Sequence, residues 1–245
     1  MHLPLADEVG LDPAEAAALD AREREVLTAA SVVVATSPWA ASALADRHGL
    51  PHVHAVAPGV TGGPPATPEP AGTRLLCVAS VTPRKAQDVL VEALAAVSDL
   101  PWTCRCVGPT RDARYTGVVR ALIDRNGLAD RTQLVGPRSG PALDAEYASA
   151  DLLVLPSRAE TYGMVVTEAL ARGVPVLATE VGGIPDALAG TRALLVPPDD
   201  VDALSAALRR WLTDAQLRDT LRRAASSHQH RTWQQCAAEL SAALS

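Results

Sequence analysis

Short apolar runs alternate with amphipathic stretches from residue 73 to residue 225. The runs predict strands, and the stretches between them, where apolar residues recur three and four positions apart, predict helices. Strands that carry apolar residues on both faces are typical of a parallel sheet covered by helices on each side. We therefore predict an α/β fold with a doubly wound parallel sheet. The predicted strands are residues 74–79, 102–107, 132–136, 151–156, 174–179 and 192–197.

Helices are predicted between and after these strands. The helical spacing is clearest in residues 85–97, where Val89, Leu90, Ala93 and Leu94 fall on one face. The predicted helices are residues 85–97, 111–125, 142–150, 163–172, 184–189, 200–213, 214–225 and 231–244. Sheets of this kind bind ligands at the carboxyl ends of their strands. The loops that follow the strands are therefore the places where chemistry is expected.

The first sixty residues follow the same pattern but contain fewer elements. Helices are predicted over residues 12–30 and 38–49, and strands over residues 31–36 and 52–57. Two strands alone seldom form a stable sheet, so residues 1–60 are expected to be part of an α/β domain whose beginning is missing. The Pro- and Gly-rich stretch that follows reads as a linker by composition, with residues 61–72 between the two domains.

Composition and charge exclude several classes. Apolar residues make up 48% of the 245, which is enough for a large core. The net charge of −6 argues against a nucleic-acid-binding protein. The 22 basic residues include a single lysine, Lys85. Neither a signal peptide nor an apolar run of the ~20 residues needed to cross a bilayer is found.

The cysteines indicate which cellular compartment the protein occupies. Cys77, Cys104, Cys106 and Cys236 form no CxxC pair and no metal-binding spacing with histidine. We interpret all four as reduced core thiols, which are typical of the cytoplasm.

Cations gather in the loops that follow the predicted strands. These loops carry Arg84, Lys85, Arg111, Arg138 and Arg158. A group of cations at one edge of a sheet suits an anionic ligand, although arginines also keep loops in solution. The lysine stands out because every other basic residue is arginine, and a compact ammonium is a common phosphate ligand where a helix begins.

The stretch RAETYGMVVTEALARGVPVLAT (158–179) places two glutamates in an otherwise apolar segment. Glu160 lies in the loop before the predicted helix, and Glu168 lies within the helix, where its carboxylate could accept two hydroxyl groups. Thr161 could cap the helix, and Gly163 would let a ligand approach the helix start, where free N–H groups attract anions. The alternatives to a ligand site are that residues 161–163 form an ordinary helix cap and that Glu168 is a solvated helix residue.

This stretch resembles the signature of family 4 glycosyltransferases, which are retaining enzymes of the GT-B fold. The resemblance extends through PRKAQDVLVEAL (83–94), ADLLVLPS (150–157) and VGGIPD (181–186), and so covers essentially all of residues 73–225. The matching signature positions are Glu160, Tyr162, Gly163, Glu168, Ala169, Gly173, Pro175 and Val176.

The resemblance implies a role for each of these residues. Glu168 would bind the ribose of a nucleotide diphosphate sugar, Glu160 would contact the transferred sugar, and Lys85 would bind the diphosphate, while His2 would lie near the sugar. The donor-binding residues that it implies are Arg84, Gly108, Val135, Gly136, Arg138, Thr161, Tyr162, Gly163, Met164 and Glu168. No metal or other cofactor is implied, because protein cations can neutralise the diphosphate.

The chain departs from the family pattern in three places. Ala79 and Ser80 stand where the family often has Gly-Arg, and Ala86 replaces the usual glycine after the lysine. Residues 1–60 are far fewer than the roughly 150 of a complete acceptor-side domain. In such a fold the last helix, within residues 226–245, would pack back toward the N-terminal part. The strand predicted over residues 31–36 would expose an unpaired edge, which could bind a partner or lead to self-association.

The leading hypothesis is therefore a retaining glycosyltransferase with an unidentified acceptor. A nucleotide-sugar-binding remnant without turnover is a second possibility. A nucleotide-sugar epimerase or hydrolase on the same fold is a third.

Overall fold

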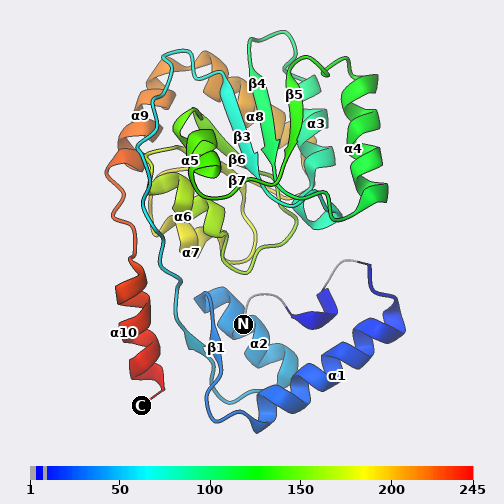
Figure 1. Ribbon diagram of the computed structural model, residues 1–245, viewed down its shortest axis with the longest axis vertical. Coiled ribbons are helices and arrows are strands. Elements are labelled where there is room, and N and C mark those ends of the chain that lie inside the picture. The colour runs from blue at the N-terminus through cyan, green and yellow to red at the C-terminus, as the bar shows by residue number, and fades with distance from the viewer. Residues whose placement is uncertain (1–3, 8–9, 245) are drawn as a thin grey trace.

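A computed structural model of the protein describes residues 4–7 and 10–244. Figure 1 shows these ranges arranged as two units, one above the other. The larger unit holds a parallel sheet between helices. The smaller one contains α1 (Pro13–Ala29) and α2 (Pro38–His48). The last helix, α10 (Trp233–Ala243), returns from the larger unit and lies beside the smaller one.

The sheet of the larger unit confirms the predicted doubly wound arrangement. Its strands are all parallel, and their order is β5-β4-β3-β6-β7-β8. Their bounds are β3 (Arg74–Val78), β4 (Thr103–Val107), β5 (Thr132–Gly136), β6 (Leu152–Leu155), β7 (Val176–Thr179) and β8 (Leu194–Val196). Each end lies within two residues of the predicted one, because both faces are buried and the apolar runs mark the strands directly.

Helices cover both faces of this sheet. The helices are α3 (Gln87–Ala95), α4 (Ala113–Arg125), α5 (Pro141–Ala148), α6 (Met164–Leu170), α7 (Ile184–Leu188), α8 (Val201–Thr213) and α9 (Ala215–Ser226). Along β3, Leu75 and Cys77 belong to the core under α3, α4 and α8, whereas Leu76 belongs to the core under α5, α6 and α7. This alternation follows from the two-residue period of a strand.

The helix predicted from residue 85 begins later than expected. A single 3-10 turn covers Pro83–Lys85, and α3 starts at Gln87. Ala86 separates them with a φ of 52°, in the left-handed region where glycine is favoured. The family's usual glycine at this position therefore suits the backbone better than the alanine found here.

The smaller unit has less sheet than the pattern predicted. Its strands, β1 (Val34–Ala35) and β2 (His54–Ala55), are parallel and only two residues long each. They pair with each other alone among the described residues, since no further strand lies beside them to extend the ladder. A separate small core joins this sheet to the helices, and it includes Leu27, Val33, Ala35, Ala41 and Leu44.

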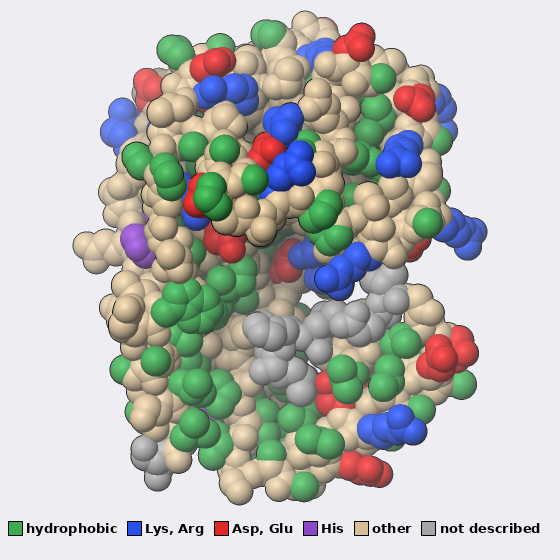
Figure 2. Space-filling view, in the orientation of Figure 1, with side chains coloured by type: hydrophobic (Ala, Val, Ile, Leu, Met, Phe, Trp, Pro, Cys, Tyr) green, Lys and Arg blue, Asp and Glu red, His purple; other side chains and the backbone are tan. Residues whose placement is uncertain are grey.

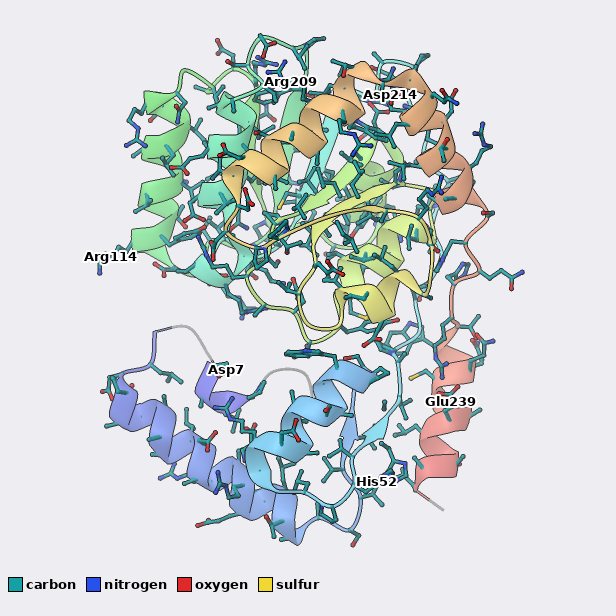
Figure 3. All side chains as sticks on the ribbon, turned by 180° about the vertical axis from the view of Figure 1, so that it is seen from behind. Asp7, His52, Arg114, Arg209, Asp214 and Glu239 are labelled. Atoms are coloured by element: carbon teal, nitrogen blue, oxygen red, sulfur yellow. The ribbon has the colours of Figure 1, made fainter. Side chains whose placement is uncertain are left out.

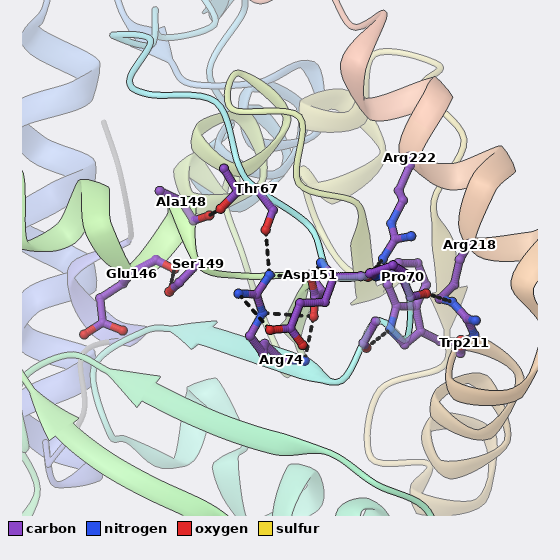
Figure 4. Close-up of polar contacts among 12 residues, drawn as sticks. Thr67, Pro70, Arg74, Glu146, Ala148, Ser149, Asp151, Trp211, Arg218 and Arg222 are labelled. Carbon is purple, nitrogen blue, oxygen red and sulfur yellow. Dashed lines mark hydrogen bonds and ion pairs between the residues drawn. The ribbon is translucent and has the colours of Figure 1, made fainter.

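The segment 61–72 contains no helix or strand but is held firmly against the larger unit. Figure 4 shows the contacts at its end. The buried carboxylate of Asp151 accepts hydrogen bonds from the backbone and the guanidinium of Arg74, both at 2.9 Å. The indole N–H of Trp211 donates to the carbonyl of Gly72 at 2.7 Å. These bonds fix the direction in which the chain enters β3.

The cysteine prediction is right for three positions and wrong for one. Cys77, Cys104 and Cys106 are buried free thiols in the sheet. Cys236 is only half-buried, because it lies on α10, which buries none of its side chains. Among the described helices, none has the length and apolar character needed to cross a membrane. A cytoplasmic location stays a prediction.

Candidate functional site

The strand order reverses between β3 and β6. These two strands are neighbours in the sheet, yet the chain continues from β3 to β4 on one side and from β6 to β7 on the other. In doubly wound sheets, ligands bind in the crevice that opens at the carboxyl ends of such a pair. The two loops at this point are residues 79–86 and 156–163. Figure 2 shows the surface hollowed between the two units, with basic side chains on its upper rim.

The Glu160 carboxylate is the centre of a polar cluster in this crevice. Its Oε1 contacts Lys85 Nζ and accepts a hydrogen bond from Ser157 Oγ at 2.8 Å. Its Oε2 lies 3.7 Å from Arg84 Nη1. Glu160 is 6% exposed, and a buried carboxylate is tolerated when charge and hydrogen bonds compensate it. These contacts explain why the loop carries a glutamate.

Lys85 is the less exposed of the two cations that contact Glu160, with 15% of its side chain exposed against 27% for Arg84. Burial lowers the pKa of its ammonium below the usual value for lysine, and the charge of Glu160 opposes the shift. A nearby anion therefore favours the charged form of this ammonium. Glu160 is that anion here, and a bound phosphate could take its place.

Glu168, on α6, is half-buried and makes a different set of contacts. Its Oε2 accepts a hydrogen bond from the hydroxyl of Tyr147 at 2.7 Å. Burial of Tyr147, and next the charge of Glu168, raise the pKa of the phenol, so the hydroxyl stays protonated as a donor. Within the described part of the chain, no group donates to Oε1 of Glu168. That oxygen is available to a ligand hydroxyl.

The prediction that Thr161 caps the helix is wrong. The N-cap of α6 is Gly163, and no side chain caps this helix. Thr161 instead uses its carbonyl, which accepts a hydrogen bond from Ser37 Oγ on the smaller unit at 2.7 Å. Gly163 has a φ of 93°, and a Cβ there would lie 2.5 Å from Ile184 Cδ1. Packing and backbone conformation already require this glycine, with or without a ligand.

The other predicted donor-binding residues lie around the same edge of the sheet. Tyr162 is buried in the core, and Met164 packs against that core. Gly108 follows β4, where a Cβ would lie 2.0 Å from the carbonyl oxygen of Ala79. Val135 and Gly136 end β5 and are half-buried.

The predicted cations do not all meet at one point. Arg138 is exposed beyond β5, with its Nε 4.0 Å from Glu146, and Arg111 is exposed before α4. Arg158 turns away to Asp88 at 3.0 Å and Asp199 at 2.6 Å. Its charge is therefore already neutralised. Arg84 and Lys85 are the pair that reaches the crevice carboxylate, while His2 lies outside the described residues.

A comparison with protein families shows which family the chain belongs to. The family described as glycosyl transferases group 1 matches residues 72–214, which is more than half of the chain. The chain belongs to this family. The match includes both crevice loops, and it confirms the resemblance seen in the sequence.

Curated relatives of this glycosyltransferase family are similar over most of the chain. A D-inositol 3-phosphate glycosyltransferase of Jonesia denitrificans is 34% identical over 70% of this chain and 42% of its own length. The Salinispora tropica protein of the same name is 32% identical over 84% of this chain and 48% of its own. The chain thus spans about half the length of the curated relatives it matches.

Solved structures share the whole arrangement, smaller unit included. Sucrose-phosphate synthase from Thermosynechococcus elongatus superposes with a TM-score of 0.80 at 25% identity, over 98% of this chain and 64% of that one. Anabaena HepE, solved with UDP and glucose, superposes with a TM-score of 0.77 at 21% identity, over 93% of this chain and 66% of that one. The fold is therefore the GT-B fold of these glycosyltransferases, represented in part.

Several contacts in and around the crevice were not foreseen from the sequence. Ser157 and Tyr147 bind the two glutamates. Ser37, the N-cap of α2, and Trp39, in its first turn, bond to the larger unit. Ser157 directly follows an apolar strand, and that position at a strand's carboxyl end was a usable signal. Nothing in the local pattern marks the other three, because each reaches its partner through tertiary packing.

Proposed function

We propose that the crevice between β3 and β6 binds a nucleotide diphosphate sugar, as the donor of a retaining glycosyl transfer. The observation that carries this proposal is the cluster of Lys85, Arg84 and Glu160 at the point where the strand order reverses. Cations there suit a diphosphate, and a carboxylate beside them suits sugar hydroxyls.

Three side chains take separate parts of the donor in this proposal. Lys85, assisted by Arg84, binds the diphosphate. Glu168 accepts a ribose hydroxyl on its Oε1, and Tyr147 holds its other oxygen in place at 2.7 Å. Glu160 contacts the transferred sugar, and the backbone of residues 162–164 lies beside it. The nucleobase lies near residues 135–138 and Gly108.

In the transfer, the bond between the sugar's anomeric carbon and the diphosphate oxygen breaks. The acceptor oxygen bonds to that carbon from the same face, and its proton passes to the departing diphosphate. Lys85 stabilises the negative charge that develops on the leaving group, which is the kind of electrostatic effect that lowers such barriers most.

Residues 1–60 and α10 belong to the acceptor side in this proposal. The relatives that support it are named for transfer to D-inositol 3-phosphate, and HepE was solved with UDP and glucose. The chain spans about half of the relatives' length, and the proposal extends transfer activity to these 245 residues.

Calorimetric titration with UDP, GDP and ADP tests the proposal. We expect one nucleotide to bind at least tenfold more tightly than the others, because residues near the base contact it directly. If none of the three binds at millimolar concentration, the proposed function fails.

A further inference from the structure

A cavity of about 200 Å³ lies beside Glu160, between the two units. α2 supplies one wall with Trp39, Ala40, Ala43 and Leu44, and residues 159–161 supply the other. Figure 3 shows Asp7, which also lines the cavity, on the side of the smaller unit that faces the larger one. Typical ligand pockets measure roughly 300–1,000 Å³, so this cavity suits a single ring.

Trp39 is the largest side chain in the apolar wall. It is 46% exposed, which is unusual for so large an apolar side chain. Its backbone N–H donates to Asp186 Oδ2 at 3.3 Å, and its ring lies 3.4 Å from the point that a Cβ on Gly182 would occupy. Ser37, the N-cap of the same helix, bonds to Thr161. The start of α2, which carries Trp39, is therefore fixed against the larger unit.

The charges around the cavity are already matched. Arg47 pairs with Asp7 at 3.1 Å and with Asp20 at 2.5 Å. Glu160 is paired with Lys85 and Arg84. Among the described residues that line the cavity, no cation is left without a carboxylate. A diphosphate bound next to it would add negative charge and repel a second anion.

We propose that this cavity is the acceptor subsite and that it takes an uncharged polyol or sugar ring, whose apolar face packs on the Trp39 indole. The inference rests on the proposed function, which places the reacting sugar carbon beside Glu160. An indole offers a rigid apolar face with a large contact area, and the ring's hydroxyls can reach the carboxylates at the rim. The specificity differs from that of the relatives, whose names specify a phosphorylated inositol.

Saturation-transfer NMR on the full chain tests the proposal with three probes: myo-inositol, methyl α-D-glucoside and D-inositol 3-phosphate. Each is titrated with and without saturating UDP. We expect at least one neutral probe to bind more tightly than the phosphate. Trp39→Ala should weaken that binding about tenfold, and Trp39→Tyr should weaken it less. Trp233→Ala is the matched control, because Trp233 is 50% exposed on α10 and does not line the cavity.

Circular dichroism confirms that each variant is folded. The proposal is overturned if no neutral probe binds, if Trp39→Ala binds as the wild type does, or if D-inositol 3-phosphate binds more tightly than both neutral probes. Failure of the proposed function looks different. In that case the wild type binds no nucleoside diphosphate, and the titrations without UDP still decide what Trp39 does.

Discussion

Replacing Glu160 with glutamine should destabilise the free protein while sparing its affinity for nucleotide. The substitution leaves Lys85 and Arg84 next to a neutral amide. Removing one partner of a buried ion pair costs about 3–5 kcal/mol. The side chains of Lys85 and Arg84 are 15% and 27% exposed, and the glutamine oxygen still accepts the hydrogen bond from Ser157. We therefore expect a loss of about 1–3 kcal/mol in the free energy of unfolding.

Thermal unfolding at neutral pH measures this loss. For a chain of 245 residues, the expected fall in Tm is about 2–12 °C. The matched control is Glu92→Gln, which removes the same charge from an exposed position on α3. A Glu160→Gln protein that melts with the wild type would refute the reasoning that Glu160 compensates the two cations.

The same variant separates the roles of the two crevice glutamates. In the free protein, Glu160 occupies the cations that a diphosphate needs, so Glu160→Gln should bind free nucleoside diphosphate at least as tightly as the wild type. It should bind the nucleotide-sugar less tightly, because a sugar contact is lost. Calorimetry with both ligands measures the difference, and an equal loss for both would show that Glu160 does not contact the sugar.

Three further predictions concern other residues. Glu168→Gln should weaken free nucleotide and nucleotide-sugar alike, by about tenfold, in the same titrations; an effect on the sugar-bearing ligand alone would contradict a ribose contact. Because burial lowers the pKa of Lys85, nucleotide affinity should fall as pH rises toward the usual lysine pKa of about 10.4. Lys85→Arg should remove that fall. If wild type and Lys85→Arg lose affinity in parallel as pH rises, the loss does not come from Lys85. Gly163→Ala should lower stability by about 2 kcal/mol or more, and chemical denaturation should show partial recovery with Ile184→Val; a neutral Gly163→Ala would mean that the loop adapts.

Much of the larger unit could be predicted from the sequence because its strands are buried on both faces. An apolar run then marks each strand, and helical spacing marks what lies between. The meeting of Lys85 and Glu160 was also predictable, since each follows a strand and parallel strands end at one edge. Their direct ion pair was not, because strand positions alone do not determine side-chain direction.

The errors have identifiable physical causes. Thr161 resembles a helix cap in sequence, but the left-handed Gly163 starts α6 two residues later and leaves Thr161 outside it. The hydrogen bond between Ser37 and Thr161 joins residues 124 positions apart, and no local pattern encodes it. Cys236 was interpreted as a core thiol only because it lacks a CxxC partner and a metal-binding spacing, and these say nothing about burial; α10 buries none of its side chains.

The central claim is that the crevice binds a nucleoside diphosphate through Lys85. Its most direct test is calorimetric titration of Lys85→Ala and wild type with whichever of UDP, GDP and ADP the wild type binds most tightly. Losing one charge-assisted contact costs about 1.5–3 kcal/mol, so the affinity should fall at least tenfold. Arg209→Ala, which removes a distant exposed cation (Figure 3), should leave it unchanged. Equal affinities for Lys85→Ala and wild type would contradict the account.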